Sequence, residues 1–153
     1  MTMEDTKTKT VVEDLYQTLQ DGHLGFSRAA EKLAEDGHDD IASKMRDFSQ
    51  QRQRMARELI ERAQMAGITV ETDEGSAAGA LHRGWIAMKD ALTGDDAHAV
   101  LAAAERGEDH AVAEYQDALE AELPAELKAF VDKQALEVKS AHDTVKQLRD
   151  ANA

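Results

Sequence analysis

The most constraining feature of this 153-residue chain is a row of side chains spaced alternately four and three residues apart between positions 101 and 119. That spacing places every member of the row on one face of an α-helix. Large apolar residues stand at both ends of the row, but its centre holds two carboxylates, Glu105 and Glu108. A buried carboxylate costs on the order of several kcal/mol unless a cation, a hydrogen-bond donor or a metal ion meets it. The row therefore predicts a helix whose buried face holds either an ion-pair network or a metal site.

Three further rows of the same kind predict three more long helices. Apolar side chains recur about every 3.5 residues over 8–35, 40–66 and 124–150, and the row with the two acids lies within 96–122. A shorter apolar stripe predicts an extra helix over 76–92, inside the long crossover between the second and third long helices. One proline and nine glycines leave few helix breakers. We therefore predict a single all-α domain over 1–153, a four-helix bundle with a short extra helix in the crossover.

Charge and composition exclude several classes of partner. The chain has 31 acidic and 18 basic residues, a net charge of -13, which repels nucleic acid and anionic membrane surfaces. It has no cysteine, so thiolate ligands and thiol nucleophiles are absent. No apolar run reaches the length of a membrane span, and the first ten residues lack the apolar core of a signal peptide. We therefore expect a cytoplasmic protein that binds neither nucleic acid nor membrane.

One interpretation of the two central acids is a structural ion-pair network. Arg52 occupies a core position of the second predicted helix, and a guanidinium can bridge two carboxylates. Gln134, at a core position of the last helix, could meet the remaining hydrogen-bond demand. This interpretation predicts a polar core of Arg52, Glu105, Glu108 and Gln134 with no cofactor. The protein would then be a non-catalytic bundle that acts by self-association or by binding another protein.

The other interpretation is a metal site. The ligand pattern of di-metal bundles, however, is only partly present in this sequence. Di-iron and di-manganese bundles take a Glu from each of two helices and a Glu-x-x-His from each of the other two. An acid followed three residues later by a histidine occurs at 35–38 and at 95–98, but both pairs lie at predicted helix ends. The second helix carries Gln50-Gln51-Arg52-Gln53-Arg54 where a mid-helix Glu-x-x-His would be expected. The full di-metal signature is therefore missing.

A smaller metal site stays open as the alternative. It would combine Glu105 and Glu108 with His142 from the last helix or His23 from the first. By analogy with the di-iron and di-manganese bundles, the expected ion is iron or manganese. The sequence alone leaves this alternative and the ion-pair network both open.

Five short strings recur, in order and at compatible spacing, in one family of bacterial proteins. They are Asp21-Gly22-His23-Leu24-Gly25-Phe26, Ala80-Leu81-His82-Arg83-Gly84-Trp85, Ala91-Leu92-Thr93-Gly94, Glu105-Arg106-Gly107-Glu108-Asp109 and Ala141-His142-Asp143. On these strings the chain resembles the bacterial ferritin-like four-helix-bundle proteins catalogued as a domain of unknown function. The resemblance implies a ferritin-like fold and a cytoplasmic bacterial protein, but no established activity. Ferritin-like proteins at large bind iron or manganese through the Glu and Glu-x-x-His set, so this chain's departure from that set gives no ground for expecting iron storage.

Overall fold

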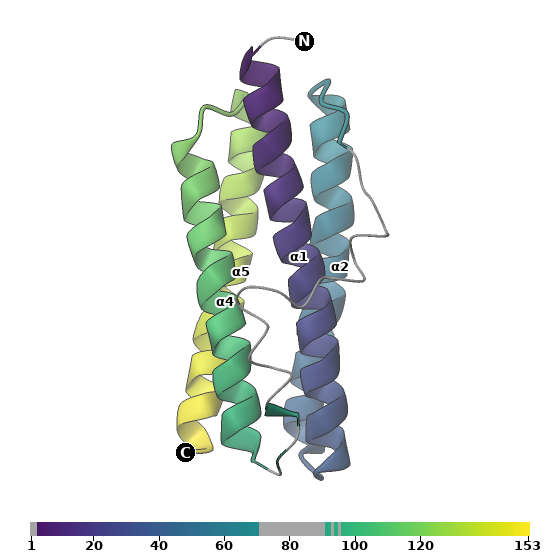
Figure 1. The fold of residues 1–153 in the computed structure, drawn as a ribbon, viewed down its shortest axis with the longest axis vertical. Coiled ribbons are helices and arrows are strands. Elements are labelled where there is room, and N and C mark those ends of the chain that lie inside the picture. Colours follow the sequence, from purple (N-terminus) through teal and green to yellow (C-terminus); the bar gives the residue numbers. More distant parts are fainter. Residues whose placement is uncertain (1–2, 71–90, 93, 95) are drawn as a thin grey trace.

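The computed structural model describes residues 3–70, 91–92, 94 and 96–153, and their secondary structure is helical. Four long helices form: α1 (Met3–Glu35), α2 (Asp39–Met65), α4 (Ala97–Glu120) and α5 (Ala125–Ala151) (Figure 1). The predicted all-α four-helix bundle is confirmed, and the largest difference in helix bounds is that α1 begins at Met3 rather than at residue 8. The extra helix predicted over 76–92 lies outside the described residues, except for its last two positions.

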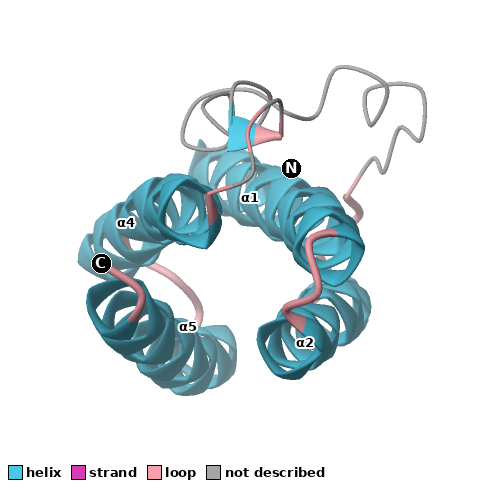
Figure 2. Ribbon diagram, turned by 90° about the horizontal axis from the view of Figure 1, so that it is seen from below, coloured by secondary structure: helices cyan, strands magenta, loops and turns pink. Residues whose placement is uncertain are grey.

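The four helices form a ring in which each contacts two others. α1 packs on α2 and α4, and α5 packs on α4 and α2, as the view along the bundle shows (Figure 2). α2 and α4 run in the same direction and stand diagonally across the ring, while α1 and α5 run in the opposite direction (Figure 1). The long link between α2 and α4 permits their common direction, because a parallel pair needs a connection that returns along the bundle.

Local signals in the sequence account for the helix ends. Gly37 adopts a left-handed φ of 85° between α1 and α2, and the N–H of His38 donates to the carbonyl of Leu33 at 2.8 Å. The Asp96 side chain caps α4 by accepting from the backbone N–H of His98 at 3.0 Å. Pro124 precedes the first residue of α5, where its missing N–H costs no helical hydrogen bond. These ends set the register in which the buried faces meet.

The bundle core consists of two apolar clusters with a charged pair at their boundary. One cluster includes Leu15, Leu19, Met55, Leu59 and Tyr115. The other includes Phe26, Leu33, Met45, Leu101 and Val145. Arg52 and Glu108 lie between them and are fully buried. The centre of the bundle is therefore polar, although both halves of its core are apolar.

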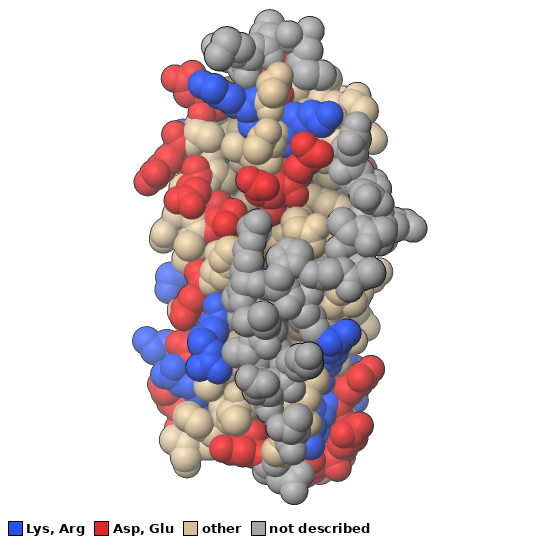
Figure 3. Space-filling model, in the orientation of Figure 1, with Lys and Arg blue, Asp and Glu red and all other residues tan. Residues whose placement is uncertain are grey.

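The surface is charged along the whole bundle. On the face in Figure 3, acidic and basic side chains occur on both halves and are interspersed. None of the described helices is both long enough and apolar enough to cross a bilayer.

Candidate functional site

Arg52 and Glu108 form a bidentate ion pair in the bundle core. Nη1 and Nη2 of Arg52 donate to Oε1 and Oε2 of Glu108, each at 2.6 Å, and both side chains are 0% exposed. The two parallel hydrogen bonds match the planar guanidinium to the planar carboxylate. The pair therefore joins α2 to the diagonally opposite α4 and neutralises the buried acid.

α1 supplies the space that the guanidinium occupies. A Cβ added at Gly22 would lie 3.2 Å from Nη1 and 3.3 Å from Cγ of Arg52, so a larger residue would press on the pair. The Cζ atom of Arg52 also lies 5.3 Å from the ring centroid of Phe26, within the range of a cation–π contact. Arg52 Nε is buried and makes no hydrogen bond. Three helices thus converge on this one side chain.

Gln134 belongs to a separate hydrogen-bond chain and does not serve the two carboxylates. Its Oε1 accepts from the Tyr115 hydroxyl at 2.9 Å, and its Nε2 donates to the backbone carbonyl of Met55 at 3.0 Å. Burial raises the pKa of Tyr115 well above its usual range, although the positive charge of Arg52 acts the other way. The Tyr115 hydroxyl therefore stays protonated and donates to Gln134. Gln134 in turn links α5 to α4 and α2.

Glu105 does not share Arg52 with Glu108, contrary to the four-residue network predicted from the sequence. Three residues along an α-helix turn the side chain by about 300°, so Glu105 points about 60° away from Glu108. That rotation directs it toward α5, where Arg149 Nη1 donates to its Oε2. Glu105 is 9% exposed and lies at the edge of the core.

The same rotation brings Glu105 to the contact between α4 and α5, where it meets two other potential metal ligands. One ligand atom from each of Glu105, Asp109 and His142 lies within 4.8 Å of the other two. His142 Nε2 is 2.6 Å from Asp109 Oδ1, and His142 Nδ1 is 3.2 Å from Asp143 Oδ1. We call Glu105, Asp109 and His142 the groove triad. It is the only such group of three or more ligands among the described residues.

The charges around His142 favour its protonated form. Partial burial lowers its pKa, but hydrogen bonds and charge interactions with Asp143 and Asp109 outweigh that effect, and the net pKa is raised. Each ring nitrogen faces a carboxylate oxygen, so an imidazolium can donate to both. The pKa of Asp143 is lowered, first by the hydrogen bond from Lys139 and then by that from His142.

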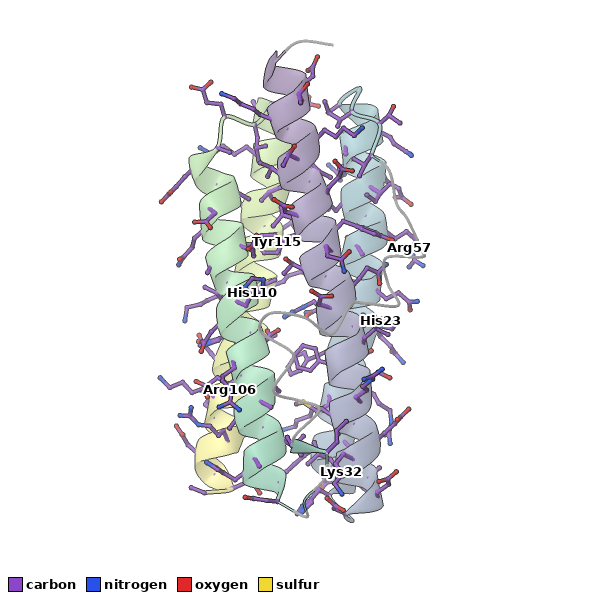
Figure 4. All side chains as sticks on the ribbon, in the orientation of Figure 1. His23, Lys32, Arg57, Arg106, His110 and Tyr115 are labelled. Atoms are coloured by element: carbon purple, nitrogen blue, oxygen red, sulfur yellow. The ribbon has the colours of Figure 1, made fainter. Side chains whose placement is uncertain are left out.

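The structure places the predicted metal ligands in different environments. Glu105 and His142 lie in the groove triad, but Arg52 occupies both oxygens of Glu108, which therefore cannot join them. His23 lies on α1 (Figure 4), where its Nδ1 is 3.0 Å from the backbone carbonyl of Ser49 on α2. Glu108 and His23 are thus parts of interhelical contacts in this structure.

The sequence analysis missed Asp109 and Arg149, although helical spacing offered a signal for each. Asp109 follows Glu105 by four residues, which returns to the same helix face. Arg149 follows His142 by seven residues, which again returns to the same face. What the spacing could not supply is which turns of α4 and α5 face each other, because the repeat within each helix does not fix its alignment on the partner across the link at 121–124.

The centre of the bundle does not fit a carboxylate-bridged di-metal centre formed from the described residues. The carboxylate of Glu108 is neutralised by a guanidinium, and the amide of Gln134 is engaged by Tyr115 and by the backbone of α2. An ion at this position would first have to displace a buried, hydrogen-bonded cation. The groove triad is instead at the rim, where the exposed Asp109 side chain reaches solvent.

Comparison with known proteins agrees with a ferritin-like bundle. The structure matches a solved structure of a mutant of Dps1 from Mycobacterium smegmatis with a TM-score of 0.81 over 97% of this chain and 99% of that chain. The sequences are 13% identical, so this likeness shows the fold alone. Residues 7–121 match the family described as domain of unknown function DUF2383, and the chain belongs to that family. No curated protein matches it.

Proposed function

We propose that this protein binds one divalent transition-metal ion at the groove triad of Glu105, Asp109 and His142. The observation that supports this function is the convergence of ligand atoms from two helices to within 4.8 Å of one another. Its binding site differs from the one predicted from the sequence, because Asp109 takes the place of Glu108. The proposal concerns binding, and it assigns no reaction to the protein.

The donor set favours a first-row transition metal. Two carboxylates and one imidazole suit ions such as iron, manganese or zinc better than calcium, which prefers oxygen ligands alone. Ligands about 2.1 Å from such an ion lie roughly 3 Å apart. The 2.6 Å contact between His142 Nε2 and Asp109 Oδ1 is slightly shorter than that separation, so an ion bound by both atoms would replace the shared proton and move them slightly apart. The ligand atom of Glu105 lies within 4.8 Å of both.

The carboxylate of Asp143 lies beside the ring nitrogen of His142 that would not bind the ion. Metal-ligating histidines commonly direct their second ring nitrogen at a carboxylate or carbonyl, which fixes the ring and raises its basicity. Asp143 Oδ1 lies 3.2 Å from His142 Nδ1, on the nitrogen that would not bind the ion. The imidazole is therefore already oriented with Nε2 toward Asp109.

Protein association, the other function predicted from the sequence, stays a prediction. Met65 and Leu136 are the large apolar residues most exposed among those described, at 79% and 73%. Single exposed apolar side chains are ordinary on soluble proteins and do not define an interface. Light scattering over a range of protein concentrations tests this function independently of metal.

The proposed function is tested by calorimetric titration of tag-free protein with Zn²⁺ and with Mn²⁺. The protein as it stands should take up about one ion per chain, and a variant with Asp109→Asn and His142→Gln should bind at least about tenfold more weakly, since it loses two of three ligands. A control with Asp117→Asn and His110→Gln changes the same residue types elsewhere on α4. Circular dichroism checks that both variants fold. Equal binding by the two variants, or no binding by the parent protein, contradicts the proposal.

A further inference from the structure

Arg149 is hydrogen-bonded both to Glu105, a member of the groove triad, and to Asp150, which lies outside it. Its Nη1 donates to Glu105 Oε2, across from α5 to α4. Its Nε and Nη2 donate to Asp150 Oδ1 at 3.1 and 2.7 Å. The guanidinium therefore divides three of its five N–H groups between a ligand of the proposed ion and an acid that is not a ligand.

Arg149 and a metal ion compete for the same carboxylate. A guanidinium within hydrogen-bond distance of Glu105 would stand only a few ångströms from a dication bound there, and like charges at that separation repel. Arg149 can release Glu105 without losing all its acid contacts, because Asp150 already accepts two of its hydrogen bonds. The side chain is 28% exposed, so solvent can replace the lost contact.

We propose that Arg149 is an internal competitor for the ion, bonded to Glu105 when the groove triad is empty and released from it when the ion binds. This inference rests on the proposed function and names the residue that lowers the affinity of the site. The two states differ in one contact, so the ion shifts the equilibrium between them by its preference for the released state.

The contact with Glu105 lies where the end of α5 meets the start of α4. The backbone carbonyl of Arg149 lies 3.2 Å from His98 Nδ1, in the first turn of α4. Arg149 is also the basic residue of the last turn of α5. Release of Glu105 therefore concerns the side chain of Arg149 alone, because the contact with His98 is made by its backbone.

The test compares Arg149→Gln with Lys146→Gln in the same titrations with Zn²⁺ and Mn²⁺. Both changes remove one positive charge from α5, and Lys146 is exposed and one turn before Arg149. We expect Arg149→Gln to bind about tenfold more tightly than the parent, since a charge-assisted hydrogen bond no longer has to be broken. Lys146→Gln should gain less than about threefold, because an exposed charge without that contact is screened.

A second measurement follows the guanidinium itself. The Arg149 Nη–H resonances, assigned by their loss in Arg149→Gln, should shift on addition of Zn²⁺ to the parent protein, because Nη1 gives up its hydrogen bond to Glu105. Equal affinities of the two variants, with binding still lost in the Asp109→Asn, His142→Gln protein, overturn the inference and leave the proposed function standing. Nη–H resonances that do not shift at saturating Zn²⁺ also overturn the inference. Failure of both the parent and Arg149→Gln to bind overturns both proposals.

Discussion

The buried ion pair makes the sharpest prediction about stability, through the substitution Arg52→Leu. The change removes both hydrogen bonds to Glu108 and leaves that acid in the core of the bundle. Leucine recovers some apolar packing in the space beside Phe26 but cannot neutralise a carboxylate. The free energy of unfolding should fall by about 3–5 kcal/mol, the cost of removing one partner from a buried pair.

That loss is large compared with the total stability of a domain of this kind. Globular domains have a free energy of unfolding of about 5–15 kcal/mol, so Arg52→Leu removes from roughly a fifth to most of that stability. With a urea dependence of about 2 kcal/mol per molar, a loss of about 4 kcal/mol lowers the urea midpoint by about 2 M. A shift of this size is well outside the error of an equilibrium melt followed by circular dichroism in the far ultraviolet.

The double variant Arg52→Leu, Glu108→Leu separates the lost pair from the isolated charge. Replacing both partners of a buried pair by apolar residues is often neutral or stabilising, so the double variant should be more stable than Arg52→Leu alone. Arg57→Leu, at an exposed position of the same helix, serves as the control and should stay within about 0.5 kcal/mol of the parent. The reasoning fails if Arg52→Leu costs less than about 1 kcal/mol, or if the second leucine brings no recovery.

Three further substitutions test other contacts by the same melts. Gly22→Ala should destabilise by about 1 kcal/mol, because overpacking against the fixed Arg52 guanidinium outweighs the gain in helix propensity; an increase in stability would contradict this. Tyr115→Phe should cost about 1–2 kcal/mol by removing the hydroxyl that donates to Gln134, and an unchanged midpoint would show that this bond is dispensable. The raised pKa of His142 stabilises the fold below its unfolded pKa of about 6.5, and this contribution is lost as pH rises through the higher folded value. His142→Gln should therefore cost somewhat under about 1 kcal/mol at a pH of about 5.5 and almost nothing at a pH of about 9, and an equal loss at both pH values would refute the sign.

The fold could be predicted from the sequence because each helix carries its own signal. Apolar side chains repeat with the helical period over each long segment, and Gly37, Asp96 and Pro124 mark the ends. Such signals are local, so they need no knowledge of the partner helix. The early start of α1 at Met3 was missed because its first turns are polar and show no apolar repeat.

The candidate site was predicted less well because it depends on contacts between helices. Spacing placed Glu105 and Glu108 on one broad face, but a rotation of about 60° was enough to send one into the core and the other to the groove. The choice between them was made by cations on other helices: Arg52 on α2 and Arg149 on α5. Neither pairing can be derived from periodicity, which defines the faces of one helix but not which turns of two helices lie side by side.

The two arginines give two acids of α4 different roles. Arg52 holds Glu108 permanently in the core, whereas an ion could replace Arg149 as the partner of Glu105. Arg52 is fully buried, fixed at both terminal nitrogens by Glu108 and confined by Gly22, so an ion reaching Glu108 would have to expel a cation that has no route to solvent. Arg149 is partly exposed and already has Asp150 as a second acceptor, so leaving Glu105 costs it one charge-assisted hydrogen bond but not its remaining acid contacts. An ion that competes for carboxylates on α4 should therefore be taken up at the groove and excluded from the core. The larger change in ion affinity should therefore follow Arg149→Gln, and the larger loss of stability should follow Arg52→Leu.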